Sequence, residues 1–366
     1  MARVVEAAAE GRWVPSPPVR HHLNKPDGRQ KVVFTFGAEA ELFFKALNRV
    51  LQPVVEPALS PLCHSFRPGH GPRSAYGQVF RVGGLDGLAS LHVDVRDYFN
   101  SIPVEGLMSS LPPAIADDGA LWLLLARTLR DRRVRSEGRI VEDGHKGAMA
   151  GTPLAPLLSN LYLGPLDRAF SDSDVTYVRY ADDVLILGSP AALVSAREVI
   201  DGHLASLGLE LNPRKTRYGA PGAPWEFLGF RYSDGRLDVA PLTAAKLRRR
   251  ARRMARRALE RPDGLAWMVR RLNRRLFGVG GRREDFSWAG WFFPLLSRTS
   301  TLSQLDTVIQ NQLRFAVTGR HERRNLGVVP YEALVAAGYV PLVTAYHAFR
   351  RSRGDFEDLI ERRVTG

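Results

Sequence analysis

The sequence predicts an α+β fold, with a sheet in residues 1–240 and a helical domain in residues 241–366. Within residues 175–188, β-prone runs lie on either side of the adjacent acids Asp182 and Asp183, the pattern of a strand, a tight turn and a second strand. The last third changes to helical periodicity. It also holds 25 Lys and Arg against 11 Asp and Glu, whereas the rest of the chain holds 27 of each.

The net charge of +14 therefore lies entirely in the last third of the chain. So lopsided a distribution predicts a basic domain that binds a polyanion, beside a neutral domain with a different task. A basic surface that serves only solubility is the alternative.

The composition excludes several classes of protein. Hydrophobic content of 45% is ordinary for a globular chain, and no apolar run approaches the ~18–20 residues that span a bilayer. Residues 1–13 carry Glu6 and Glu10 and lack the pattern of a secretory signal. The single cysteine, Cys63, excludes internal disulfides and a cysteine-built zinc site. We therefore expect a cytoplasmic protein with no membrane contact.

The N-terminal region predicts a basic hairpin followed by an amphipathic helix. Residues 31–36 have the composition of a strand, and residues 38–51 have the apolar spacing of a helix. Lys25, Arg29 and Lys31 gather on the hairpin. These cations either bind a triphosphate or are simply solvated.

A third acid lies on an earlier strand. Residues 90–95 alternate between apolar and polar side chains, as in a strand whose two faces differ. Asp94 lies on the polar face near the end of this strand, 88 residues before Asp182. Taken alone, it would be a strand-end acid facing water. Beside the acid hairpin, it predicts three carboxylates on separate strands of one sheet.

Helices and a second hairpin complete the neutral part of the chain. Residues 119–133 predict a helix, and the Gly-rich loop 146–153 leads into an apolar helix, where the backbone can approach a ligand closely. After the acid pair, residues 190–207 predict a helix capped by Ser189, and residues 225–232 predict a second hairpin.

The basic domain begins with a helix over residues 242–259, whose apolar residues recur at helical spacing. Eight Lys and Arg surround this apolar stripe without interleaved Glu, so the paired charges of an ordinary surface helix do not explain them. They favour contact with a phosphate backbone, with a solvated face as the alternative. A further helix is expected at residues 302–315.

One strand acid and a hairpin acid pair are what two-metal phosphoryl transfer requires. In such sites carboxylates hold two divalent cations ~3.5–4 Å apart, which clamp the attacking and leaving oxygens. Oxygen ligands suit two Mg²⁺ ions, with Mn²⁺ as a substitute. One cation would lower the pKa of a primer 3′-hydroxyl, and the other would stabilise the departing pyrophosphate.

Taken in order, these motifs resemble those of reverse transcriptases, specifically the bacterial group II intron-like lineage. Tyr180 to Asp183 resembles the catalytic hairpin of that family, and residues 93–99 resemble its first catalytic motif. The other segments that resemble family motifs are the fingers segments 25–31 and 65–69, the template and nucleotide loop 147–160, the following motif 209–216 and the primer grip 227–230. Order and spacing agree from Arg20 to Arg320.

The resemblance implies a right-hand polymerase fold. Fingers would occupy residues 1–90, a palm with an antiparallel sheet and inserted finger segments residues 91–240, and a basic α-helical thumb residues 241–366. The implied activity is that of an RNA-directed DNA polymerase, with an RNA template, a DNA primer and dNTPs as partners. The short chain after the thumb implies a stand-alone member without an endonuclease domain.

The resemblance also implies roles for single residues. Asp94, Asp182 and Asp183, with the backbone carbonyl of Val95, would hold the Mg²⁺ ions. Lys215 would protonate the departing pyrophosphate, with an ordinary surface lysine as the alternative. The candidates for nucleotide binding are Lys25, Arg29, Lys31, Phe99, Ala150 and Gly151, and those for primer and template binding are Tyr180, Phe227, Leu228, Gly229, Arg249, Arg253 and Arg256.

Phe99 bears on the choice of nucleotide. It falls where the family keeps a bulky side chain under the sugar, and a phenyl ring there would clash with a 2′-hydroxyl. The resemblance therefore implies selection of deoxynucleotides and argues against an RNA-synthesising polymerase.

The chain departs from the family at the nucleotide loop. Met149-Ala150-Gly151 replaces Pro-Gln-Gly, and Ala155 replaces a serine before Pro156. Similar losses occur in reverse transcriptases outside mobile introns, so we expect antiphage defence with a dedicated noncoding RNA. Untemplated or protein-primed DNA synthesis of the abortive-infection type is one alternative. A maturase-like intron RNA-binding protein is another, which the intact acids disfavour. The sequence indicates neither an oligomeric state nor an effector protein.

Overall fold

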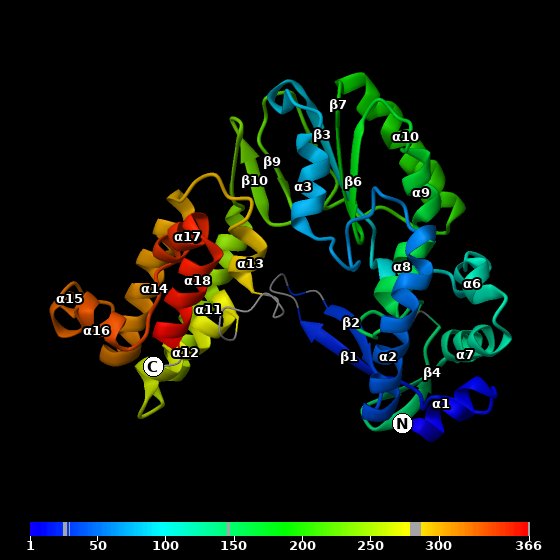
Figure 1. The fold of residues 1–366 in the computed structure, drawn as a ribbon, viewed down its shortest axis with the longest axis horizontal. Coiled ribbons are helices and arrows are strands. Elements are labelled where there is room, and N and C mark those ends of the chain that lie inside the picture. The colour runs from blue at the N-terminus through cyan, green and yellow to red at the C-terminus, as the bar shows by residue number, and fades with distance from the viewer. Residues whose placement is uncertain (25–27, 29, 145–146, 279–286, 365–366) are drawn as a thin grey trace. The chain divides into compact units, whose positions relative to one another are not determined.

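The computed structural model describes residues 1–24, 28, 30–144, 147–278 and 287–364. The chain divides into two compact units, Met1–Ala223 and Pro224–Gly366. Each unit is described by itself. Figure 1 shows the order of the helices and strands along the chain.

The first unit opens with a four-stranded sheet of order β2-β1-β4-β5. Its strands are β1 (Val19–Asn24), β2 (Gln30–Thr35), β4 (Arg133–Ser136) and β5 (Arg139–Glu142). The strand predicted at 31–36 is therefore confirmed with a shift of one residue. The helix predicted at 119–133 ends at Arg130, because Arg133 already belongs to the β4–β5 hairpin, which the sequence did not predict.

Helices build much of the core of the first unit. The predicted helix at 38–51 is α2, and the apolar helix after the Gly-rich loop is α8, whose side chains are almost all buried. The helices and 3₁₀ turns up to the acid hairpin are α1 (Ala2–Ala9), α2 (Ala38–Val55), η1 (Glu56–Ala58), α3 (Pro72–Phe80), η2 (Leu85–Gly87), α4 (Tyr98–Ser101), α5 (Val104–Ser109), α6 (Pro113–Ala116), α7 (Gly119–Arg130), α8 (Ala155–Tyr162) and α9 (Gly164–Ala169).

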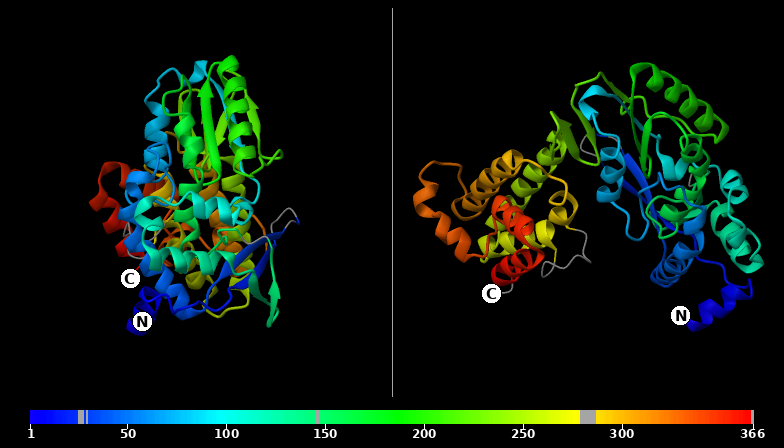
Figure 2. Two further views of the ribbon diagram at one scale, coloured as in Figure 1. Left: turned by 90° about the vertical axis from the view of Figure 1, so that its right-hand side faces the viewer. Right: turned by 45° about the horizontal axis from the view of Figure 1, so that its top comes forward.

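A second four-stranded sheet, of order β6-β7-β3-β8, contains the acid hairpin. Its strands are β3 (Ala89–Asp94), β6 (Thr176–Tyr180), β7 (Asp183–Gly188) and β8 (Arg217–Gly219), and all its pairings are antiparallel. Helix α10 (Pro190–Ser206) packs against β3 and β7, as Figures 1 and 2 show. The Ser189 side chain accepts a hydrogen bond from the Ala192 N–H, which confirms the predicted cap.

The second unit combines a small sheet with a helical bundle. The sheet has the order β11-β10-β9, and its β9–β10 turn is the second predicted hairpin. The strands are β9 (Trp225–Phe227), β10 (Phe230–Ser233) and β11 (Arg236–Val239), and the helices are α11 (Pro241–Leu259), α12 (Gly264–Phe277), α13 (Trp288–Phe292), α14 (Ser300–Thr318), α15 (Asn325–Val328), α16 (Tyr331–Ala336), α17 (Leu342–Arg351) and α18 (Arg353–Val364). Helices α11, α12 and α14 pack against one another. No described helix is both long and apolar enough to cross a membrane.

Candidate active site and arginine cavity

Strand pairing brings the three predicted acids to one end of the second sheet. Asp94 and Asp183 are direct partners in the β3–β7 register, and Asp182 lies in the two-residue turn before β7. The turn residue Ala181 has φ of 58°, in the left-handed region that two-residue hairpins commonly require. The Val95 N–H donates to the Asp182 carbonyl at 3.1 Å, which ties the turn to the end of β3.

Each of the two strand acids has a partner within the first unit. Asp94 is only 4% exposed; it accepts a hydrogen bond from Asn212 Nδ2 at 3.0 Å and forms an ion pair with Lys215. The Asn212 N–H also donates to the Asp94 carbonyl at 2.7 Å. Asp183 contacts His92 Nε2 across the strand pair. Asn212 and His92 were not predicted from the sequence as partners of the acids. His92 does share the polar face of β3 with Asp94.

The third acid is less well compensated. Partial burial raises the pKa of Asp182 to about 6, and the charges of Asp94 and Asp183 add to the rise. Crowded carboxylates of this kind fit a divalent cation, because an ion with two positive charges offsets their repulsion and prefers oxygen ligands. Within the described residues, no three His, Cys, Asp or Glu side chains already converge as ligands. Lys215 and His92 hold Asp94 and Asp183 instead.

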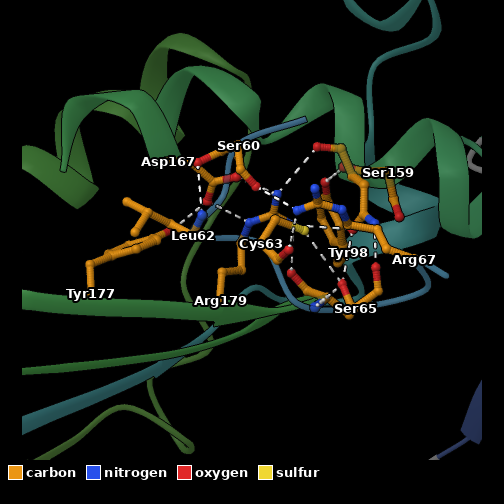
Figure 3. A network of polar contacts seen from close by, with 12 residues as sticks. Ser60, Leu62, Cys63, Ser65, Arg67, Tyr98, Ser159, Asp167, Tyr177 and Arg179 are labelled. Carbon is orange, nitrogen blue, oxygen red and sulfur yellow. Dashed lines mark hydrogen bonds and ion pairs between the residues drawn. The ribbon is translucent and has the colours of Figure 1, made fainter. Parts of the chain in front are cut away.

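A buried ion pair lies beneath the acid turn (Figure 3). Arg179 donates from Nε to Asp167 Oδ1 at 2.7 Å and from Nη2 to Asp167 Oδ2 at 2.5 Å, and both side chains are 0% exposed. The Tyr177 hydroxyl donates to the same Asp167 Oδ1 at 2.9 Å. Because each of the two charges has several hydrogen bonds, the free-energy cost of burying the pair is offset.

This network reaches the backbone of the acid turn. Arg179 Nη1 donates to the Ala181 carbonyl at 3.2 Å, and the Ala181 N–H donates to Ser65 Oγ at 2.8 Å. Ser65 Oγ in turn donates to Asn160 Oδ1 at 3.0 Å, and Asn160 Nδ2 donates to the Ser65 carbonyl at 2.7 Å. Ser65, Asn160 and Arg179 therefore fix both peptide groups of Ala181, the residue before Asp182.

A sequence profile of a known family matches the part of the chain that contains the three acids. The sequence profile described as "Reverse transcriptase (RNA-dependent DNA polymerase)" matches residues 39–232, which is more than half of the chain and includes all three acids. The chain belongs to the reverse transcriptase family. No curated protein sequence matches it.

Solved structures similar to this reverse transcriptase include telomerases. Apo telomerase from Candida tropicalis aligns with a TM-score of 0.53 and 11% identity, over 100% of this chain and 67% of that one. A form of it truncated from the C-terminal domain gives a TM-score of 0.48 and 12% identity, over 65% of this chain, and this chain spans only 58% of that one. At such identities the likeness shows the fold alone, and the predicted right-hand polymerase fold is confirmed.

The Gly-rich loop at residues 147–153, predicted to border the nucleotide, is fixed to its surroundings. The Ala150 N–H donates to Asn100 Oδ1 at 3.0 Å, and the Ala150 carbonyl accepts from the Phe34 N–H at 2.7 Å. Gly151 has φ of +98°, and a Cβ there would lie 3.0 Å from the Phe34 carbonyl oxygen. The Ala148 N–H donates to the Phe99 carbonyl at 2.8 Å, so the structure brings Phe99 and this loop together.

One further candidate for nucleotide binding, Lys31, lies on the first hairpin. Lys31 is exposed on β2, opposite Leu23 of β1. Lys25 and Arg29 lie outside the described residues.

The candidates for primer binding fall in both units. Tyr180 ends β6, and its ring lies 6.2 Å from that of Phe66. Phe227, Leu228 and Gly229 form the end of β9 and the β9–β10 turn, in the second unit. Leu228 and Gly229 have φ of 51° and 85°, and the Leu228 carbonyl accepts from Trp291 Nε1 at 3.1 Å, so this turn is anchored to the bundle.

The second unit contains a cavity of about 660 Å³ that is lined by arginines. The cavity residues are Arg250, Arg253 and Arg257 of α11, Arg271, Arg274 and Arg275 of α12, and Met254. Of the arginines predicted to bind primer and template, Arg253 lines this cavity, whereas Arg249 and Arg256 do not. Positions 250, 253 and 257 share one face of α11, and the packing of α12 selects that face.

The positive charge of this cavity is uncompensated within the described part of the chain. None of its six arginines forms an ion pair there with a carboxylate. Burial lowers the pKa of Arg250, and the charges of Arg275, Arg253 and Arg271 lower it further. Crowded cations of this kind attract polyanions such as phosphate-rich ligands.

Proposed function

We propose that the chain is an RNA-directed DNA polymerase that extends a primer 3′-hydroxyl with deoxynucleotides on an RNA template. The observation that carries this proposal is the strand register, which pairs Asp94 with Asp183 and places Asp182 in the adjoining turn, inside the segment that matches the family. Three carboxylates there serve no packing purpose, and partial burial makes their mutual repulsion costly.

Asp94, Asp182, Asp183 and the carbonyl of Val95 would hold two Mg²⁺ ions, for which Mn²⁺ is a substitute. When bound, the ions activate the 3′-oxygen and neutralise the charge of the departing pyrophosphate. The 3′-oxygen forms a bond to the α-phosphorus while the bond from that phosphorus to the bridging oxygen breaks. The hydroxyl proton passes to solvent, and Lys215, whose ammonium group contacts Asp94, donates a proton to the pyrophosphate.

The other site residues would position the substrates. Phe99 would lie against the sugar and exclude a 2′-hydroxyl, while Lys31, with Lys25 and Arg29, would bind the triphosphate. The backbone of Ala150 and Gly151 would border the nucleotide. The primer would contact Tyr180 and the turn of Phe227, Leu228 and Gly229, and Arg249, Arg253 and Arg256 would contact the phosphates of primer and template.

In this proposal residues 1–90 are fingers, residues 91–240 the palm and residues 241–366 the thumb. The motif order supports a place in the group II intron-like lineage, and we propose that the protein acts in the cytoplasm. The altered Met149-Ala150-Gly151 loop supports a role outside mobile introns, and we propose antiphage defence with a dedicated noncoding RNA as template.

A second candidate, untemplated or protein-primed DNA synthesis, is favoured by the same loop. Its backbone groups are bound to Asn100 and Phe34, and its middle residue is an alanine that has no side-chain hydrogen-bonding group. A maturase-like RNA-binding role alone would not require the three acids.

The test is to purify the protein with the RNA that accompanies it, sequence that RNA, and supply Mg²⁺ and labelled dNTPs. The variants are Asp182→Ala/Asp183→Ala and, as a matched control, Asp201→Ala, which removes an exposed acid of α10 that pairs with Arg197. Acid-dependent DNA complementary to the bound RNA supports the proposal. Acid-dependent DNA that matches no RNA supports the second candidate, and equal DNA from wild type and the double variant contradicts both.

A further inference from the structure

Phe66 has two features that are uncommon for a phenylalanine. Its φ is 55°, in the left-handed region that bulky side chains rarely adopt, and it is 42% exposed. Exposure forgoes the stabilisation that a phenyl ring gains by burial, and the backbone conformation adds strain. Stability alone therefore does not account for a phenylalanine at this position.

The neighbours of Phe66 hold its backbone in this conformation. On one side, Ser65 is fully buried and bonded to Asn160 and to the Ala181 N–H. On the other side, Arg67 Nη1 donates to the carbonyl of Cys63 at 2.6 Å, and Arg67 Nε donates to a carboxylate oxygen of Glu56 at 3.1 Å. With both flanking side chains anchored, the loop cannot relax without breaking these bonds.

The ring of Phe66 lies beside two side chains of the candidate active site. Its centroid is 6.3 Å from that of Phe99, with the ring planes at 65°, and 6.2 Å from that of Tyr180. The edge-to-face arrangement with Phe99 is one that aromatic pairs favour. The Phe99 ring also lies near that of Tyr98, with centroids 5.6 Å apart. Two aromatic rings therefore neighbour Phe99.

We propose that Phe66 is a positioning residue that holds the Phe99 ring in place and thereby sharpens selection of deoxyribonucleotides over ribonucleotides. The inference rests on the proposed role of Phe99 at the sugar. A side chain excludes a 2′-hydroxyl only if it cannot move aside, and a ring with two aromatic neighbours has less freedom to move than a ring with one. Phe66 supplies the contact on the side toward Tyr180 and the acid turn.

The two explanations for Phe66, fold stability and positioning of Phe99, predict different results for Phe66→Gly. Glycine adopts φ of 55° without strain, so Phe66→Gly relieves the backbone while it removes the ring. If Phe66 only stabilises the fold, the variant lowers the melting temperature and reduces activity with both kinds of nucleotide equally. If Phe66 positions Phe99, the melting temperature stays level or rises while selectivity falls.

The experiment measures kcat/KM for a dNTP and the matching rNTP, together with the melting temperature, for wild type, Phe66→Gly, Phe66→Tyr and Phe80→Ala. Phe80 is the matched control, because it is 45% exposed at the end of α3 and makes no ring contact with Phe99 within the described residues. We expect the dNTP-to-rNTP ratio to fall about fivefold in Phe66→Gly, mainly through a lower KM for the rNTP. Phe66→Tyr keeps the ring and should retain the ratio.

An unchanged ratio in Phe66→Gly would overturn the inference, as would an equal fall in Phe80→Ala. Phe99→Ala serves as the reference for the site itself, and its ratio should fall further than that of Phe66→Gly. If Phe99→Ala keeps the wild-type ratio while synthesis remains acid-dependent, the inference is wrong and the proposed polymerase activity stands. Absence of acid-dependent synthesis in the wild type contradicts the proposed activity and the inference together.

Discussion

The acid site of the first unit and the arginine cavity of the second both concentrate charges of one sign, but they compensate them differently. Asp94 has Lys215 and Asn212 as partners, and Asp183 has His92. Within the described residues, the six arginines of the cavity pair with no carboxylate, and the charges of three of them depress the pKa of Arg250.

The difference indicates what each region requires from outside the chain. The acid site is held in shape by its own protein partners, and in the proposed mechanism its chemistry depends on small cations and a nucleotide. An external polyanion would offset the charge of the cavity, so we propose that the cavity binds nucleic acid. The comparison predicts that catalysis and nucleic-acid affinity can be removed separately.

The largest effect is expected from the acid site. Asp182→Asn retains the shape of the side chain and removes its charge, so DNA synthesis should fall by about 10³-fold or more because the metal ligand is lost. RNA affinity, measured by fluorescence anisotropy, should stay within about twofold of wild type. A large loss of RNA affinity in this variant would show that the two regions do not act separately.

The next largest effect concerns the buried network beneath the acid turn. Arg179→Met leaves Asp167 buried without its partner, which should lower the free energy of unfolding by about 3–5 kcal/mol in urea denaturation. The control Arg197→Met breaks an exposed pair on α10 and should cost about 0.5 kcal/mol or less. Combining Arg179→Met with Asp167→Leu should recover much of the loss, and failure to do so would contradict this account of the pair.

A smaller effect is expected when the pH is lowered, on the stability of the first unit. Burial lowers the pKa of His64 to about 4, with His70 and Arg67 contributing, so the unfolded chain binds the proton more tightly. Stability should therefore be fully present above the unfolded pKa of about 6.5 and fall as the pH drops toward 4, by about 2 kcal/mol from this group. His64→Gln should flatten this part of the pH profile. An unchanged profile would exclude His64 as its source.

The smallest effect is expected from the cavity, where many arginines share the task. Arg253→Gln/Arg257→Gln should weaken RNA binding about tenfold and reduce the slope of log affinity against log salt by about 1 per arginine. The matched control Lys246→Gln/Arg252→Gln neutralises two exposed basic residues of the same helix that lie outside the cavity. Equal losses from both pairs would mean that the cavity has no special role.

The sequence reveals the acid site well because its signals are local. The strand around Asp94 and the hairpin around Asp182 each show their pattern within a few residues, and the register then aligns Asp94 with Asp183. The contacts that hold the acid turn in place are not local in the sequence. Ser65 contacts Ala181 from 116 residues away, and no spacing rule connects the two.

The arginine cavity shows a second limit. The arginines of α11 surround its apolar stripe on both sides, so periodicity cannot decide which side is functional. Helix α12 distinguishes the two sides, because its Arg271, Arg274 and Arg275 line one cavity with Arg250, Arg253 and Arg257.

The β4–β5 hairpin was missed because its few residues are mostly polar. Asp143, the residue after β5, pairs with Arg20 of β1, which is 123 residues away in the sequence.

The most direct test of the central claim is primer extension on an RNA template of defined, non-repeating sequence, with a DNA primer, Mg²⁺ and all four dNTPs. We expect the wild type to synthesise DNA whose sequence is the complement of the template, and Asp182→Asn to synthesise none above background. DNA of unrelated sequence would contradict templated synthesis, and equal products from both proteins would contradict the assignment of the acids as the catalytic centre.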